Sequence, residues 1–180
     1  SGLDQIIALH LKLSYSILTF NLKFVKLSSK DEKCLYEDDS CTLFSFGLKH
    51  RIPCWGFKIV EKKKKRNIIA SMIKKYNIPF ASINNIKLGY DYIDLNGHVI
   101  KNDILTNDSY NSRSYAYCSD TKFFKKLSSF IMGVDLLYHE STFHSDLRQR
   151  ARTTFHSTSQ DAAKTALIGN VKKLILGHFS

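Results

Sequence analysis

The chain has 180 residues, of which 43% are hydrophobic, enough for one domain, or a large part of one, with an ample core. It has 27 basic and 16 acidic residues, a net charge of +11, which favours a polyanionic partner such as RNA or DNA, although a basic protein without such a partner shows the same balance. Cys34, Cys41, Cys54 and Cys118 lack CxxC spacing, which argues against a zinc ribbon or a redox motif. No apolar run reaches membrane-spanning length, and we expect a soluble, cytoplasmic protein.

The first third of the chain predicts a helix followed by strands. Apolar residues at positions 3, 6, 7, 9, 11 and 13 have the spacing of an amphipathic helix over residues 3–14. Alternating and aromatic residues predict strands at residues 18–27, 42–49 and 54–60, and the polar residues 28–39 predict a loop. The last two strands form a hairpin around the turn at residues 51–53, which places His50 at a strand end, a suitable position for a ligand.

The middle third contains the most basic run of the chain, which consists of Lys62, Lys63, Lys64, Lys65 and Arg66. Such a run is most often a solvated connection, but it can also bind phosphates by displacing counterions. Helical spacing follows over residues 67–76 and stops before Pro79. Asn96 and Gly97 predict the turn of a small hairpin within residues 86–100, and the polar residues 101–113 predict a loop.

The last third alternates strands and helices, which indicates a layered α/β arrangement. Strands are predicted at residues 115–118, 134–138 and 174–176, and a helix at residues 122–132. Ser157 and Gln160 have the spacing of a capping box that opens a second helix, which continues to residue 167 and ends at Gly169.

Ionisable residues follow these strands directly. Asp120 follows the first strand, His139 and Glu140 follow the second, and His178 follows the third. Strands of a layered α/β fold direct such terminal residues at a shared crevice. Because aspartate and histidine are ligands for zinc or manganese, the pattern points first to a metal site.

Five segments, taken in order, resemble the ribonuclease Z family, the tRNA 3′-processing endonucleases of the metallo-β-lactamase superfamily. They are LKHRIPCWGF, YAYCSDT, LLYHESTF, FHSTSQDAA and LILGHFS, and the resemblance covers nearly the whole chain. It implies a metallo-β-lactamase-like αββα sandwich, present here as an incomplete portion.

The resemblance also implies a role for each matching residue. His50 and His178 resemble metal ligands, and Asp120 resembles the aspartate that bridges two metal ions, usually zinc, with manganese as the alternative. His156 resembles the proton donor to the leaving oxygen. His139 and Glu140 match a motif whose residues orient His156 or a ligand, but a purely structural hydrogen-bond acceptor explains Glu140 equally well.

The implied reaction is hydrolysis of the phosphodiester on the 3′ side of precursor tRNA, which leaves a 3′-hydroxyl. Two metal ions would clamp the scissile phosphate, and a histidine can donate a proton near neutral pH. Two alternatives stay open: a metallo-β-lactamase-fold hydrolase of another phosphodiester or a small ester, and a non-catalytic half that binds tRNA.

Three features of the sequence depart from the family pattern. The family's His-x-His-x-Asp-His motif is absent, and the chain stops directly after His178. We therefore expect residues 1–180 to be the C-terminal portion of a longer enzyme and to be inactive alone. The third departure is the family's tRNA-binding arm, which is reduced here: residues 61–85 are expected to form it, with Lys62–Arg66 as its nucleic-acid contact.

An incomplete sandwich would also expose an apolar face of its sheet, which would favour a homodimer.

Overall fold

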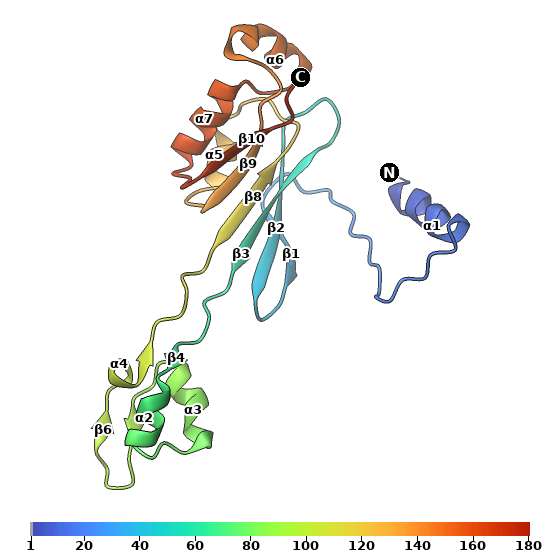
Figure 1. Ribbon diagram of the computed structural model, residues 1–180. Helices are drawn as coiled ribbons and strands as arrows, with labels where there is room; N and C mark the ends of the chain where they lie inside the picture. Colours follow the sequence, from blue (N-terminus) through green and yellow to red (C-terminus); the bar gives the residue numbers. More distant parts are fainter. Residues whose placement is uncertain (1) are drawn as a thin grey trace.

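The computed structural model describes residues 2–180, and its centre is a six-stranded mixed sheet in the order β1-β2-β3-β8-β9-β10 (Figure 1). The strands are β1 (Lys33–Glu37), β2 (Cys41–Gly47), β3 (Trp55–Glu61), β8 (Ser114–Cys118), β9 (Leu136–Glu140) and β10 (Leu174–Gly177). Neighbours from β1 to β8 are antiparallel, and β8, β9 and β10 are parallel. The predicted mixed α/β class is confirmed.

The directions of the strands bring four chain segments to one edge of the sheet. β3 lies antiparallel between β2 and β8, so β2 runs the same way as β8, β9 and β10. The carboxyl ends of these four strands therefore meet at the same edge. The residues that follow them there are His50 after β2, Asp120 after β8, Glu140 at the end of β9 and His178 after β10.

Two helices, α5 (Lys126–Phe130) and α7 (Ser159–Ile168), cover one face of the sheet. The core between them contains Phe46, Cys118, Leu127, Ile131 and Leu137, together with other small and aliphatic side chains. The predicted helix over residues 122–132 is shorter than expected, because α5 begins only at Lys126 and residues 122–125 connect the sheet edge to it.

The start of α7 corrects the predicted capping box. Thr158 and Asp161 form the box, with each side chain accepting from the other residue's backbone N–H. Ser157 cannot cap the helix, because its hydroxyl donates instead to the carbonyl of Thr121 at 2.6 Å. Two shorter elements, η1 (Ser145–Leu147) and α6 (Arg148–Thr154), connect β9 to this helix.

The opposite face of the sheet has no covering layer within residues 2–180. Tyr117 and Tyr138 stack on this face with ring centroids 4.9 Å apart, and they are flanked by exposed Ile59 and Ile175. An apolar sheet face of this kind is normally buried against another layer.

The segment before the sheet differs from its prediction. The expected helix is present as α1 (Leu3–Leu13), but none of its residues is buried and it lies apart from the sheet (Figure 1). The strand expected at residues 18–27 was wrong, because these residues find no backbone partner and Phe20 and Val25 stay exposed. The loop expected at residues 28–39 was also wrong: it contains β1, whose charged and polar residues form the exposed edge of the sheet.

Residues 62–113, which we call the arm, project from the ends of β3 and β8 (Figure 1). Their elements are β4 (Asn67–Ile68), α2 (Ala70–Lys75), α3 (Phe80–Lys87), β5 (Tyr92–Ile93), β6 (Val99–Ile100), α4 (Asn102–Leu105) and β7 (Thr106–Asn107). The tip has a small core of its own around Ile78, Ile86 and Leu105. At the base, Glu61 N–H donates to the carbonyl of Arg113, and the Arg113 N–H donates to the Glu61 carboxylate.

The hairpin predicted around Asn96 and Gly97 is present in the arm, but the elements predicted before and after it differ from those observed. The helix expected from residue 67 begins only at Ala70, because β4 pairs with β7 instead. The loop expected at residues 101–113 contains α4 and β7, and α3 was not predicted. These elements are too short to show a hydrophobic period. The arm extends well beyond the predicted range 61–85. None of the helices within residues 2–180 is long and apolar enough to cross a membrane.

Candidate active site

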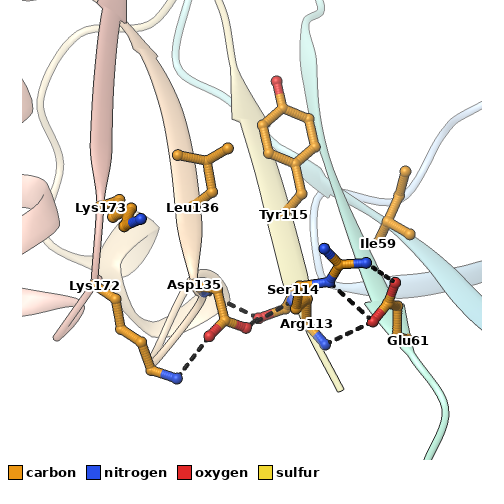
Figure 2. A pocket seen from close by; sticks show the side chains of 9 residues that line it. All are labelled: Ile59, Glu61, Arg113, Ser114, Tyr115, Asp135, Leu136, Lys172 and Lys173. Atoms are coloured by element: carbon orange, nitrogen blue, oxygen red, sulfur yellow. Dashed lines mark hydrogen bonds and ion pairs between the residues drawn. The ribbon is translucent and has the colours of Figure 1, made fainter. Parts of the chain in front are cut away.

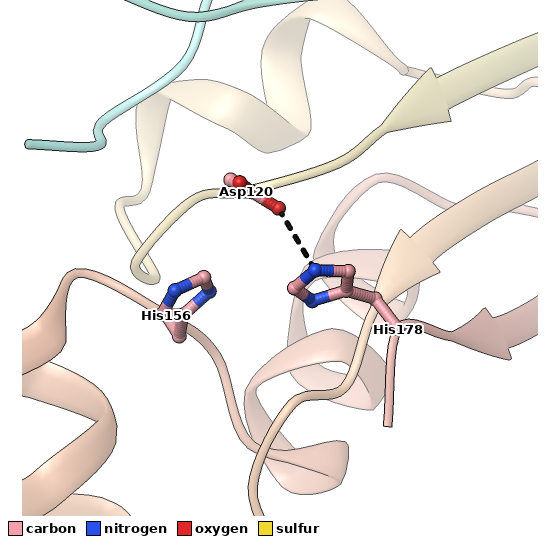
Figure 3. A group of neighbouring side chains, drawn as sticks. All are labelled: Asp120, His156 and His178. Carbon is pink, nitrogen blue, oxygen red and sulfur yellow. Dashed lines mark ion pairs between the residues drawn. The ribbon is translucent and has the colours of Figure 1, made fainter. Parts of the chain in front are cut away.

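Asp120 lies at the centre of the polar cluster on the carboxyl edge of the sheet. His178 Nε2 lies 3.5 Å from its Oδ1, and His50 Nε2 lies 3.7 Å from its Oδ2. His156 completes the group: Asp120, His156 and His178 each offer a ligand atom within 4.8 Å of the others (Figure 3). A carboxylate with an imidazole near each oxygen has the arrangement expected of a group that bridges two cations.

His50 makes its hydrogen bond through Nδ1, which leaves Nε2 free to act as a ligand. His50 Nδ1 lies 3.1 Å from the carbonyl oxygen of Phe155. A carbonyl oxygen only accepts, so Nδ1 must hold the proton of the neutral ring and Nε2 presents its lone pair toward Asp120.

His178 is oriented in the same way through a hydroxyl. Its Nδ1 lies 2.8 Å from Thr142 Oγ1, and that hydroxyl donates to Glu140 Oε2 at 2.6 Å. Since the hydroxyl hydrogen points at the carboxylate, Thr142 accepts from His178 Nδ1–H. The lone pair of His178 Nε2 is therefore directed at Asp120, as for a metal-ligating histidine whose second nitrogen is held by a partner.

Glu140 is the hydrogen-bonding hub behind these histidines and is fully buried. Oε1 accepts from the Thr121 N–H at 2.6 Å, and Oε2 accepts from the Thr142 hydroxyl and from the Ser157 N–H at 3.1 Å. Several donors on one buried carboxylate offset the loss of its hydration. Glu140 therefore holds three separate chain segments together at the edge of the sheet.

His156 contacts Glu140 directly. Its Nδ1 lies 2.9 Å from Glu140 Oε1, and its ring packs edge-on against His50 and parallel to His178, with centroid distances of 4.9 and 5.5 Å. With Nδ1 engaged by the carboxylate, Nε2 is the nitrogen left to face the cluster. A histidine supported by a buried carboxylate is suited to transferring a proton.

The backbone around the cluster is strained at two positions. Phe155 has φ 62° and His178 has φ 59°, in the left-handed region that bulky residues rarely adopt. Gly177 precedes His178, and a Cβ there would lie 2.3 Å from the Tyr138 hydroxyl. Strain of this kind persists only where surrounding contacts hold it, and here it turns the Phe155 carbonyl toward His50.

The structure does not bring His139 into this group. His139 is fully buried, its Nδ1 bonds the carbonyl of Glu140 at 2.7 Å, and its Nε2 has no partner within residues 2–180. Burial lowers the pKa of His139, which favours the neutral ring. The position follows from strand alternation, since neighbours on β9 point to opposite faces.

The donor set fits zinc or manganese. Imidazole nitrogens suit zinc and a carboxylate suits both zinc and manganese, and the candidate ligands His50 and His178 each have their other ring nitrogen held by an acceptor. His50, Asp120 and His178 are the residues that would hold the ions, with His156 close enough to serve as a further ligand.

Thr142, Thr121, Ser157 and the carbonyl of Phe155 were not predicted as site residues. Their contacts join segments far apart in the chain, such as His50 with Phe155, and no spacing in the sequence reports that. Thr142 and Ser157 do lie inside the segments LLYHESTF and FHSTSQDAA, so the motifs were the available signal.

The basic run at the base of the arm is largely paired. Lys62 bonds Glu37 at 2.8 Å, Lys65 bonds Asn84 at 2.7 Å, and Arg66 contacts Asp103, Thr106 and Asp108. Lys63 and Lys64 have no carboxylate partner within the described part of the chain. The structure thus separates two cations without a carboxylate partner, Lys63 and Lys64, from Lys62, which bonds β1, and from Lys65 and Arg66, which bond within the arm.

A second hollow lies at the other end of the sheet, away from the histidines (Figure 2). Ile59, Tyr115 and Leu136 form its apolar wall. Most of its charged groups neutralise one another: Arg113 pairs with Glu61 at 3.2 Å and Lys172 with Asp135 at 2.6 Å. The Lys172 ammonium and the Ser114 donors lower the pKa of Asp135 to about 2. Four of its charged groups are therefore paired, and Lys173 is the one lining charge without an ion-pair partner within residues 2–180.

No protein-family model matches the chain. Curated relatives, however, match it over nearly its whole length. The ribonuclease Z of Bacteroides fragilis is 40% identical over 179 residues, which are 99% of this chain and 59% of that protein. The ribonucleases Z of Bacteroides thetaiotaomicron and Cytophaga hutchinsonii are each 39% identical, with 99% of this chain and 57% of each relative covered. The chain therefore spans less than two thirds of the length of these relatives.

Solved structures show the same fold. The short form of human tRNase Z superposes with a TM-score of 0.63 at 22% identity, over 99% of this chain and 58% of that one. The metallo-β-lactamase fold protein YhfI from Bacillus subtilis gives 0.51 at 14% identity, over 93% and 47%. Over the stretch that it spans, the chain is thus a homologue of the curated ribonucleases Z and has a metallo-β-lactamase fold.

Proposed function

We propose that this chain is part of a metal-dependent endoribonuclease that matures the 3′ end of tRNA. The observation that supports this most strongly is the placement of His50 and His178 around Asp120, with His156 held on Glu140 beside them. The motif order and the homology to ribonucleases Z support precursor tRNA as the substrate class.

In the proposed reaction, water attacks the phosphorus on the 3′ side of the tRNA and the bond from phosphorus to the 3′ oxygen breaks. The tRNA leaves with a 3′-hydroxyl and the trailer keeps a 5′-phosphate. His156 gives a proton to the departing 3′ oxygen, and Glu140 keeps its ring oriented. Thr142 and the Phe155 carbonyl hold His178 and His50.

A zinc or manganese pair would supply the positive charge that polarises the phosphodiester and acidifies water. His50, Asp120 and His178 are the proposed ligands. These three residues are fewer than a complete two-metal site needs, so we propose that residues 1–180 bind metal weakly by themselves and do not cleave RNA.

The uncovered sheet face around Tyr117 and Tyr138 supports a second proposal, that copies of the chain associate as a homodimer. Sedimentation across a range of concentrations tests this proposal. A monomer at every concentration would contradict it.

Cleavage of a 3′-extended precursor tRNA by the longer parent protein, with zinc or manganese added, tests the proposed reaction. We expect product with a 3′-hydroxyl, and a loss of about 10²–10⁴-fold in rate for His156→Ala, the usual contribution of a general acid. The matched control is His144→Ala, because His144 is exposed and pairs only with Asp146. Faster cleavage of a small phosphodiester than of the precursor would favour a different substrate. Tight tRNA binding without turnover in excess metal would favour a non-catalytic binding half.

A further inference from the structure

A basic pocket of about 520 Å³ adjoins the candidate active site. Its charged and aromatic lining consists of Lys30, Lys49, His50, Arg51, Lys122 and Phe155. His50 is shared with the polar cluster around Asp120, because its Nε2 faces Asp120 while the residue also lines this pocket. A ligand in the pocket would therefore be a direct neighbour of any phosphate bound at Asp120.

The cations of the pocket are not neutralised by carboxylates. Within residues 2–180, Lys30, Lys49, Arg51 and Lys122 have no acidic side chain in ion-pair distance. This differs from the hollow of Figure 2, where Arg113 and Lys172 are paired. Free ammonium and guanidinium groups around a concave surface attract phosphate.

Aromatic rings position three of these lysines instead. Lys122 Nζ lies 4.2 Å from the centroid of Phe155, Lys30 Nζ lies 4.1 Å from Trp55, and Lys49 Nζ lies 5.0 Å from Phe124. Such contacts hold a cation without cancelling its charge. The lysines are thereby pre-arranged for an anion, which reduces the ordering that binding requires.

The rest of the pocket lining is apolar: Leu48, Ile52 and Pro53 line it together with the half-buried ring of Phe155. Apolar and aromatic side chains next to cations match a nucleotide, whose base packs on the apolar side chains while its phosphates meet the lysines. Inorganic phosphate alone would leave the apolar side chains unused.

We propose that the basic pocket binds the nucleotide of the RNA strand that adjoins the scissile phosphate. The proposal rests on the proposed function for the identity of the RNA. The bound nucleotide is either the last one retained by the tRNA or the first one of the trailer, since both border the scissile phosphate.

Fluorescence anisotropy of this chain with two RNAs tests the proposal. One RNA is a precursor tRNA with a short 3′ trailer, and the other is the same tRNA ending at the cleavage point. The pocket variant is Lys49→Gln/Arg51→Gln/Lys122→Gln. The control is Lys12→Gln/Lys23→Gln/Lys26→Gln, which removes the same charge from exposed residues outside the pocket.

We expect the pocket variant to bind the precursor about 10-fold more weakly and to lower the slope of log affinity against log salt by roughly 1, as for the one or two phosphates that flank a single nucleotide. The control should change affinity less than about 2-fold. A loss seen only with the trailer-bearing RNA places the trailer nucleotide in the pocket. An equal loss with both RNAs places the retained nucleotide there.

Equal affinities for the pocket variant and the control would contradict nucleotide binding in the basic pocket, while tRNA would remain the proposed substrate. Absence of binding by the wild-type chain to either RNA would overturn both proposals. Cross-linking of wild-type protein to 4-thiouridine on each side of the scissile phosphate gives a test that needs no variant. Adducts should fall on residues 48–53, Lys122 or Phe155, and adducts confined to the arm would contradict the pocket.

Discussion

Glu140 Oε1 lies 2.9 Å from His156 Nδ1, and the same fully buried carboxylate reaches His178 through the hydroxyl of Thr142. One side chain at the end of β9 therefore orients both the proposed proton donor and a proposed ligand. The two explanations that the sequence left open for Glu140, structural acceptor and orienting group, describe the same contacts.

Replacing Glu140 by glutamine should weaken both stability and catalysis. A glutamine amide turns its NH2 group toward a donor in either orientation: toward Thr121 N–H if it replaces Oε1, or toward Ser157 N–H if it replaces Oε2. We expect a loss of about 1–3 kcal/mol in the free energy of unfolding. Cleavage by the parent protein should fall about 10²-fold or more, because His156 loses the carboxylate that orients it. Glu37→Gln is the control, since Glu37 makes only a half-exposed pair with Lys62. An unchanged rate in Glu140→Gln would show that His156 acts without it.

Thr142→Val should reduce metal affinity without removing a ligand. Valine keeps the shape of the side chain, but His178 Nδ1 loses its acceptor and the tautomer with a lone pair on Nε2 is no longer enforced. We expect zinc affinity to fall about 10- to 100-fold, the usual effect of losing a partner of a ligand. The comparison is Thr153→Val, which changes an exposed hydroxyl bonded only to its own helix. Equal affinities in both variants would mean that Thr142 does not orient His178.

The basic run of the arm should divide into two functional classes. Lys63→Ala/Lys64→Ala is expected to weaken tRNA binding and lower its salt slope by roughly 1.5–2, because these cations are free. Arg66→Ala should instead destabilise the arm by about 1 kcal/mol, because it removes the bonds to Thr106, Asp103 and Asp108. Hydrogen exchange in the arm and anisotropy with tRNA separate the effects. Identical behaviour of the two variants in both measurements would contradict this division.

His139 should make the fold less stable in mild acid. Burial lowers its pKa below 6.5, so the folded state keeps the ring neutral while the unfolded chain takes up a proton as the pH falls below 6.5. The contribution of His139 to the free energy of unfolding is therefore complete above pH 6.5. Below pH 6.5 it decreases, by at most about 1.4 kcal/mol per pH unit for one group. His139→Asn retains a donor for the Glu140 carbonyl but cannot titrate, and it should flatten denaturant-measured stability between pH 6.5 and 5. The control His10→Asn, at an exposed position, should leave the pH dependence of stability unchanged. A slope equal to wild type in His139→Asn would exclude His139 as the source.

The sequence predicted the sheet edge and its polar residues because strand ends and motifs are local features. His50, Asp120, Glu140 and His178 all lie where strand directions place them. The arm and β1 were missed or misplaced because two-residue strands and charged edge strands have no hydrophobic period, and pairing with a neighbour decides their structure. The basic pocket unites residues 30, 48–53, 122 and 155, and only the tertiary fold shows that they meet.

Zinc and manganese binding by the purified chain is the most direct test of the cluster around Asp120. A chelator-competition titration should compare wild type with Asp120→Asn, His178→Ala and the exposed control Asp146→Asn. We predict weak binding by wild type and by Asp146→Asn, well below two equivalents, and a further loss of at least about 100-fold in the two ligand variants, beyond the effect of losing a partner of a ligand. Equal binding by all four proteins would contradict the assignment of Asp120 and His178 as metal ligands.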